Sequence, residues 1–202
     1  MSHNSEFHGA HARSYGQRPS FWRTKSLVDS RRLQLKPGQR LLDVGCGTGT
    51  DLENLFARYG KNVELYGAEP SEDMLKQMRR EVVESPNVHL TNATATKLPY
   101  ADNFFDYVTC SLVLHHVPDG DRQTALKEMH RALKPGGTVL IKEWGQPRST
   151  LGRFIARFWR NHAYVGKSIA HDLQSSLRQA GFKRVEVLSV KRGIMYQLAA
   201  TK

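Results

Sequence analysis

The stretch "RLLDVGCGTGTDLENL", residues 40–55, decides the fold. An apolar run leads into a loop with three glycines, Gly45, Gly47 and Gly49, and the spacing of apolar residues then becomes helical. Glycine lets the backbone approach a ligand closely, and the first N–H groups of the following helix can bind it. The stretch therefore predicts a β-strand, a ligand-binding loop and an α-helix.

The rest of the chain continues this alternation of strands and helices. We expect strands at 40–45, 63–70, 87–93, 105–114, 138–144, 183–190 and 194–200, and helices at 21–35, 50–60, 72–84, 121–133 and 171–181. Ser71 can cap the helix that follows it, and "KPGG" (134–137) predicts a turn. The alternation from 40 to 144 predicts an α/β fold with a parallel sheet between helices. The short gap at Gly193 makes the last two strands antiparallel.

Length and composition favour a single enzyme-sized domain. The 202 residues suit one core, with an N-terminal lid at 1–35, a main domain at 36–202 and a lid insertion near 145–170. The two cysteines, Cys46 and Cys110, lie in apolar stretches, which argues against a disulfide framework and a cysteine-rich zinc site. The polar first twenty residues contain no signal peptide, and no apolar run has membrane-spanning length. We therefore expect a cytoplasmic protein.

The net charge is +11 and the isoelectric point is near 9.9. Such a balance attracts phosphate-rich surfaces, or it simply keeps the protein soluble. Because the charges are spread along the chain, solubility is the simpler interpretation. One local cluster, at 150–164, is an exception.

The glycine spacing and a downstream carboxylate restrict the ligand. A dinucleotide-binding loop has the spacing G-x-G-x-x-G/A, whereas this loop reads G-x-G-x-G with Thr50 in the sixth position, and no Walker loop is present. Glu69 follows about twenty residues later, at the end of the second strand, where nucleotide folds place a carboxylate on ribose hydroxyls. A carboxylate accepts both hydroxyl hydrogens and repels a ribose phosphate. These residues predict a nucleoside with free ribose hydroxyls.

Four motifs in this order resemble the class I S-adenosylmethionine-dependent methyltransferases. They are "LLDVGCGTGT", Glu69, "LPYADNFFDYVTCSLVLHHV" and "LKPGGTVLI", and the resemblance covers about residues 36–144. It is closest to the group of demethylmenaquinone and related quinone methyltransferases, whose C-terminal motif the tail also resembles. The resemblance implies a Rossmann-like, doubly wound, seven-stranded sheet, mostly parallel with an antiparallel C-terminal strand. It also implies S-adenosylmethionine as the cofactor and S-adenosylhomocysteine as its product.

The resemblance assigns cofactor-binding roles to a set of residues. They are Asp43, Gly45, Cys46, Gly47, Thr48, Gly49, Glu69, Pro70, Met74, Thr94, Ala95 and Ser111. The family places the loop under the methionine part, Glu69 at the ribose and the residues after the third strand at the adenine. Thr94 stands where the family often has aspartate, although its hydroxyl can still accept a hydrogen bond. The alternatives are a capping role for Asp43, a core position for Met74 and a solvated charge for Glu69.

His115 and His116 are the candidates for proton transfer. They follow the fourth strand, at the edge where open α/β sheets bind ligands, and the pKa of histidine suits a base near neutral pH. Adjacent side chains point in different directions, so we expect His116 to line the pocket and His115 to pack beneath the loop or bond to the backbone. A base is needed only if the acceptor must lose a proton. No histidine has metal-ligand spacing with a carboxylate, and Asp119 fits a helix cap.

Two segments outside the sheet are predicted to cover the substrate. The N-terminal segment carries Tyr15, Phe21 and Trp22, which could shield the cofactor. The segment 150–164 carries the apolar residues Leu151, Phe154, Ile155, Phe158 and Trp159. The candidate acceptor and lid contacts are Tyr15, Trp22, Phe158 and Trp159.

The segment 150–164 is also a basic amphipathic helix. Arg153, Arg157 and Arg160 share one helix face. Such a helix can lie on an anionic membrane or cover an apolar substrate, and otherwise its arginines simply face water.

Three functions remain open on the sequence alone. The first is methyl transfer to a small apolar or aromatic acceptor, such as a quinone precursor or a lipid-like metabolite. The second is methylation of RNA or another macromolecule through the basic surface, and the third is a cofactor-binding partner without activity. The chain has "SLVLHH" after the fourth strand, where many base-N methyltransferases have Asn-Pro-Pro-Tyr. This difference favours the small acceptor over nucleic acid.

Overall fold

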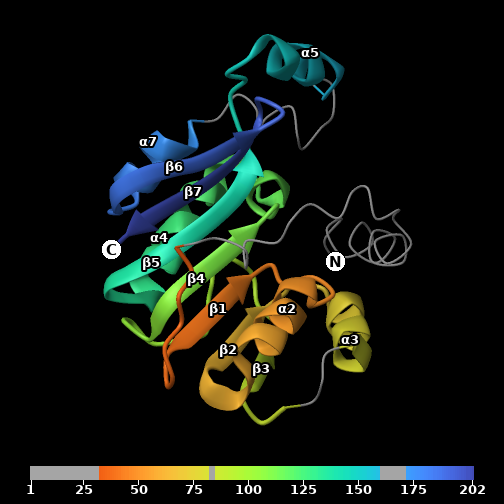
Figure 1. Ribbon diagram of the computed structural model, residues 1–202, viewed down its shortest axis with the longest axis vertical. Helices are drawn as coiled ribbons and strands as arrows, with labels where there is room; N and C mark the ends of the chain where they lie inside the picture. Colours follow the sequence, from red (N-terminus) through yellow and green to blue (C-terminus); the bar gives the residue numbers. More distant parts are fainter. Residues whose placement is uncertain (1–31, 82–84, 160–171) are drawn as a thin grey trace.

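The computed structural model describes residues 32–81, 85–159 and 172–202, which form one sheet with helices on both faces (Figure 1). The strands are β1 (Arg40–Val44), β2 (Glu64–Ala68), β3 (Val88–Thr91), β4 (Phe105–Ser111), β5 (Leu133–Trp144), β6 (Lys183–Lys191) and β7 (Met195–Thr201). The helices are α2 (Thr50–Tyr59), α3 (Glu72–Glu81), α4 (Arg122–Ala132), α5 (Thr150–Trp159) and α7 (Leu173–Gln179), with short 3-10 turns η3 (Gly60–Asn62), η4 (Leu114–His116) and η5 (Asp119–Asp121). The helix expected at 21–35 lies outside the described residues apart from its last four positions.

The sheet has the strand order β3-β2-β1-β4-β5-β7-β6. Strands β1 to β5 pair in parallel, and β7 is antiparallel to both of its neighbours. This arrangement confirms the predicted doubly wound sheet with an antiparallel C-terminal strand. Because β1 and β4 are parallel neighbours in the middle, their carboxyl ends and the loops that follow them meet at one edge.

The predicted "KPGG" turn differs from the structure in one respect. Strand β5 begins at Leu133, before the turn, because Leu133 already pairs with Phe105 of β4. The pairing with β4 then shifts register, and Gly136 has a φ of +78°. The chain therefore bends at Gly136 within strand β5. The backbone of the bend is held by bonds to the last residue, from Gly136 N–H to the Lys202 carbonyl (3.2 Å) and from Lys202 N–H to the Gly137 carbonyl (3.0 Å).

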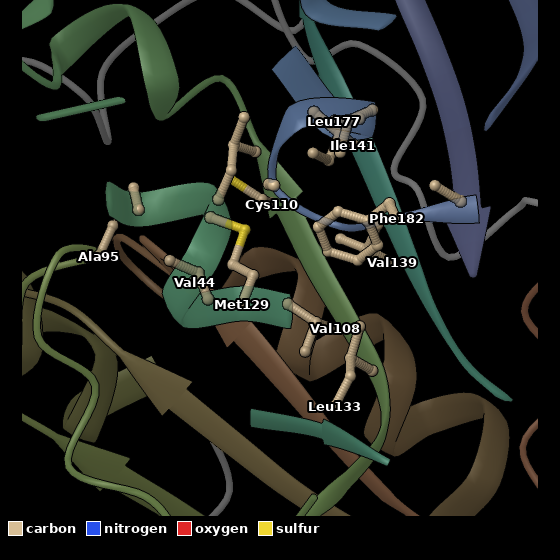
Figure 2. Packing of buried hydrophobic residues seen from close by; sticks show 14 of the residues in the cluster. Val44, Ala95, Val108, Cys110, Met129, Leu133, Val139, Ile141, Leu177 and Phe182 are labelled. Atoms are coloured by element: carbon tan, nitrogen blue, oxygen red, sulfur yellow. The ribbon is translucent and has the colours of Figure 1, made fainter. Parts of the chain in front are cut away.

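Alternation along the strands divides the apolar residues between two core layers. In β1, Leu42 and Val44 belong to one buried cluster and Leu41 to the other, as the period of two requires. The first cluster includes Met129 of α4 and Leu177 of α7, and Figure 2 shows these side chains against the face of β4 and β5. The second cluster includes α2 through Leu52 and Leu55, with Leu33 and Leu35 before β1.

The predicted helix start at Ser71 is confirmed. The Ser71 Oγ accepts a hydrogen bond from the backbone N–H of Met74 (3.3 Å), which satisfies one of the N–H groups in the first turn of α3. Both cysteines, Cys46 and Cys110, are free and buried, as expected. Within the described ranges, no helix is long and apolar enough to cross a membrane.

Candidate cofactor and acceptor site

The glycine loop joins β1 to α2 in a conformation that requires glycine. Gly45, Gly47 and Gly49 have φ values of +69°, +56° and +82°. A Cβ at Gly45 would also collide with the side chain of Val113, whose Cγ1 would lie 2.8 Å away. By contrast, among the described residues a Cβ at Gly47 would meet only the Met74 sulfur, at the ordinary contact distance of 3.8 Å. Gly45 is therefore a packing glycine, and Gly47 leaves the backbone accessible to a ligand.

Glu69 closes the loop from the neighbouring strand. Its Oε2 accepts a hydrogen bond from Gly47 N–H (3.1 Å), and its Oε1 accepts one from Ser71 N–H (3.0 Å). The backbone around Glu69 is fixed by Asn92, whose amide donates to the carbonyl oxygens of Glu69 (3.3 Å) and Pro70 (3.1 Å). The structure thus places Glu69 against the loop, 22 residues away in sequence.

Asp43 is a buried carboxyl at the end of β1. The Thr109 hydroxyl donates to its Oδ1 at 2.8 Å across the β1–β4 pair. Burial raises the pKa of Asp43 well above its usual range, and the charges of Asp51 and Glu69 raise it further. Three carboxyl groups therefore gather around the glycine loop. Their mutual repulsion favours a ligand that brings positive charge.

Several predicted cofactor residues lie around this loop in different ways. Met74 is buried beside Gly47, and Pro70 is exposed at the end of β2. Thr48 is half-buried in the loop itself. Cys46 faces the core: its sulfur would lie 2.8 Å from a Cβ at Gly67 of β2, so only its backbone borders the loop. Burial raises the pKa of the Cys46 thiol well above its usual range, which keeps it protonated.

The predicted adenine residues follow β3. Thr94 is exposed, and its hydroxyl lies 3.1 Å from that of Thr96. Ala95 is buried in the first core cluster, so its side chain supports the loop. Ser111 is half-buried at the end of β4, beside Leu112, whose φ is +59° and whose N–H donates to the carbonyl of Lys142 (2.8 Å). Ser111 thus stands at the same sheet edge as the glycine loop.

The two histidines in η4 occupy different environments. His115 is buried, and its Nδ1 lies 2.9 Å from Oε1 of Glu143, the penultimate residue of β5. Glu143 is itself buried and accepts bonds from the backbone N–H groups of His115 (3.2 Å) and Trp144 (2.7 Å). His116 is half-buried, with its ring centroid 4.0 Å from that of His115. His115 is therefore the histidine held beneath the loop, and a role for His116 in the pocket stays a prediction.

A buried arginine holds η4 in place. The Nε of Arg122, in the first turn of α4, donates to the carbonyls of Leu114 (2.9 Å) and Val117 (3.2 Å). Its guanidinium also pairs with Asp119 at 3.1 Å. Asp119, for which a helix cap was the alternative, thus pairs with a side chain of α4. The arrangement fixes the backbone on either side of the two histidines.

Sequence reasoning missed the partners that act across the sheet. Thr109, Val113, Arg122 and Glu143 contact or hold the predicted site residues. Thr109 and Val113 lie within the motif at 98–117, but no feature of that motif marks them as contacts, and Arg122 and Glu143 lie outside the four motifs. The only usable signal was Glu143, because a carboxylate in the apolar run "TVLIKEW" requires a partner when buried.

The predicted lid contacts are not all described. Tyr15, Phe21 and Trp22 lie outside the described residues, as does Arg160. The backbone of Phe158 and Trp159 belongs to α5, but their side chains are not described. In the described parts of the chain, no group of three or more histidine, cysteine or acidic residues is placed to hold a metal ion.

The residues around the loop fit S-adenosylmethionine. This cofactor carries a sulfonium and an ammonium group, which the cluster of Asp43, Asp51 and Glu69 favours. A Cβ at Gly47 would meet no described atom closer than 3.8 Å, and the Glu69 carboxylate can accept hydrogen bonds from ribose hydroxyls. A phosphate in this position would instead raise the electrostatic cost of this carboxyl cluster further.

Comparisons with known proteins agree with this geometry. A family model described as a methyltransferase domain matches residues 41–137. The chain is 32% identical to a demethylmenaquinone methyltransferase of Bacillus mycoides (strain KBAB4), over 88% of this chain and 83% of that protein. It is 34% identical to the enzyme of the same name from Geobacillus kaustophilus (strain HTA426), over 81% and 79%.

A solved structure shares the fold at lower identity. The putative methyltransferase crystallised with the Haloferax volcanii Trm112 methyltransferase activator superposes with a TM-score of 0.74, at 17% identity, over 96% of both chains. This superposition agrees with the sheet order described above. The chain belongs to the class I S-adenosylmethionine-dependent methyltransferases, and S-adenosylmethionine is its cofactor.

Proposed function

We propose that this methyltransferase transfers the methyl group to a small apolar or aromatic acceptor, of the kind represented by a quinone precursor. The observation that carries the proposal is the likeness to demethylmenaquinone methyltransferases along four fifths or more of the chain. The half-buried residues at and beside η4 support it, because they place the apolar side chains of Val113 and Val117 close to His116 in the chain.

The cofactor supplies an activated methyl group, so the protein mainly has to bind, orient and exclude water. In this proposal Gly47 and Gly49 present the loop backbone to the methionine part, and Glu69 accepts the ribose hydroxyls. Asp43 either faces the amino group or orders the loop through Thr109. Pro70, Met74 and the residues after β3 border the adenine.

The acceptor side of the site is assigned to η4. Glu143 fixes the ring of His115 through its Nδ1, so His115 acts as a positioning residue for the loop. His116 is then the histidine that can receive a proton from an acidic acceptor, for example a phenolic hydroxyl whose ring carbon is methylated. A reduced quinol is electron-rich and suits attack on a sulfonium, whereas an oxidised quinone does not.

The proposal is tested by transfer from S-adenosylmethionine carrying a labelled methyl group. A reduced prenylated naphthoquinol should become labelled, and the oxidised quinone and total RNA should not. His116→Asn should lower the rate most at neutral and higher pH, where a neutral imidazole can remove the proton, and least at low pH, without changing the affinity for S-adenosylhomocysteine. Labelling of RNA alone would assign the chain to the macromolecular class.

A methyltransferase for RNA is the alternative, and the net charge of +11 is the observation that favours it. The transfer of labelled methyl groups to total RNA, described above, distinguishes this alternative from a small-molecule acceptor. Transfer to RNA that persists after removal of surface cations would also contradict a role for the basic surface in that activity.

A further inference from the structure

The α5 helix lies at one end of the sheet, beyond the carboxyl end of β5 and beside the β6–β7 hairpin (Figure 1). Its inner face is buried, with Ala156 packed on Ile194 of the hairpin. Its outer face carries Leu151 and Phe154, whose exposed fractions are 58% and 61%. These are the large apolar side chains that the described residues leave exposed.

Cations surround this apolar pair. Arg153 and Arg157 are exposed on α5 itself and share one helix face, on which Arg157 lies one turn after Phe154. Further exposed cations lie before the helix and in the hairpin, at Arg148, Lys191 and Arg192. No aspartate or glutamate occurs between Glu143 and Asp172, or after Glu186, so neither segment carries a compensating negative charge.

The helix and the hairpin are held together as one surface. The backbone N–H of Arg148 donates to the carbonyl of Gly193 (2.8 Å), and Gly145 N–H donates to that of Ile194 (2.9 Å). A Cβ at Gly152 would lie 2.6 Å from the Gly193 carbonyl oxygen, so helix and hairpin backbones touch there. The cations of α5 and of the hairpin therefore belong to the same connected surface as Leu151 and Phe154.

We propose that α5 and the tip of the β6–β7 hairpin form a docking surface for an anionic lipid bilayer. The surface consists of Leu151, Phe154, Arg148, Arg153, Arg157, Lys191 and Arg192. Its partner must offer dense negative charge and, beside it, an apolar layer into which leucine and phenylalanine side chains insert. The headgroup boundary of a membrane that contains anionic lipid offers both.

The apolar pair argues for lipid over nucleic acid. A phosphate backbone would use the cations, but it would leave Leu151 and Phe154 in water. The docking surface also lies at a useful place, because α5 follows the carboxyl end of β5, at the sheet edge that holds the glycine loop and η4. A docked protein would thus present its cofactor edge toward the membrane. The surface goes beyond the proposed reaction and exists whatever the acceptor is.

Sedimentation with lipid vesicles tests the proposal. The full chain should bind phosphatidylcholine vesicles that contain phosphatidylglycerol, should bind pure phosphatidylcholine vesicles much more weakly, and should dissociate as salt is added. Leu151→Ser with Phe154→Ser should lower the partition coefficient about ten-fold or more, because insertion is lost while every charge remains. Arg153→Ala with Arg157→Ala should lower it by a similar factor.

The matched control is Lys36→Ala with Lys61→Ala, which removes the same charge from exposed positions before β1 and in η3. This pair should lower binding no more than about two-fold. All variants should keep their thermal stabilisation by S-adenosylhomocysteine, which separates this proposal from the assignment of the cofactor.

Three results would overturn the docking surface. The first is no binding of the wild type to anionic vesicles. The second is equal loss of binding in the arginine pair and in the lysine control, which would reduce the effect to net charge. The third is binding to an RNA oligonucleotide that exceeds binding to vesicles and is unchanged by the two serine substitutions, which would assign the cations to nucleic acid.

Discussion

At the scale of single residues, the site is dominated by carboxyl groups that the fold brings close together. Asp43 is buried against Thr109 and near two other acids, so its charged form is disfavoured. Such a position costs stability near neutral pH, and sites built for ligands carry this kind of cost. This cost is the one expected from the cofactor-binding role proposed for Asp43.

The pH dependence of stability reports on Asp43. The pKa of Asp43 in the folded state lies above the ordinary value of 3.8. The stability that its protonated form contributes to the folded state is therefore fully present below pH 3.8, and it is lost as the pH rises through the folded pKa. Asp43→Asn has no such loss. We expect its Tm to exceed that of the wild type by about 3 °C or more near pH 8, with a smaller gain at about pH 5.

Thermal unfolding over this pH range measures the effect. Asp73→Asn, an exposed aspartate in the first turn of α3, is the control and should show no gain that grows with pH. A constant difference between Asp43→Asn and the wild type at every pH would contradict the burial of an ionisable carboxyl.

At the scale of elements, the β1–α2 loop and the end of β4 depend on each other. Gly45 N–H donates to the Ala68 carbonyl (2.7 Å), which ties the loop to β2. The opposite side of Gly45 lies against Val113, at the start of the segment that carries both histidines. The glycine loop and the segment that leads into η4 are therefore in direct contact, so a change in one displaces the other.

Gly45→Ala tests that contact against a control with the same backbone geometry. Gly38 has a φ of +79° and no atom within 4 Å of an added Cβ, whereas Gly45 has a φ of +69° and the Val113 side chain in the way. Both substitutions pay for a left-handed alanine, about 1–2 kcal/mol. Gly45→Ala should cost about 1–3 kcal/mol more, because it overpacks the site.

Chemical denaturation gives both free energies of unfolding. Adding Val113→Ala to Gly45→Ala should recover much of the difference, since it removes the colliding methyl groups. Equal losses in Gly45→Ala and Gly38→Ala would show that the contact with Val113 carries no cost.

At the scale of the whole molecule, cofactor binding should raise the free energy of unfolding and the Tm. A ligand that binds only the folded state at a hundred-fold excess over its Kd stabilises it by about 2.7 kcal/mol. For a domain of this size that raises the Tm by roughly 5–10 °C. S-adenosylhomocysteine should produce such a shift in the wild type.

Glu69→Gln should reduce this shift, because a neutral amide replaces a charged acceptor of hydrogen bonds. We expect the Kd for S-adenosylhomocysteine to rise about ten-fold or more. Glu72→Gln, which removes an exposed carboxylate from the first turn of α3, should leave the Kd unchanged. Isothermal titration measures both constants, and an unchanged Kd in Glu69→Gln would remove Glu69 from the site.

The sequence by itself determined what depends on local pattern. Alternating apolar residues predicted the strands and their two faces, the three glycines predicted the ligand loop, and Ser71 predicted the start of α3. Even Glu69 could be named, because the length of one strand–helix–strand unit places the end of β2 beside the end of β1.

Only the tertiary structure decided the contacts between elements that are distant in sequence. It paired His115 with Glu143 across 28 residues, placed Val113 against Gly45, and joined α5 to the β6–β7 hairpin. The physical reason is that sheet order and register bring these residues together, and neither leaves a periodic trace in the chain. Local spacing therefore identified the cofactor loop, and packing across the sheet decided what surrounds it.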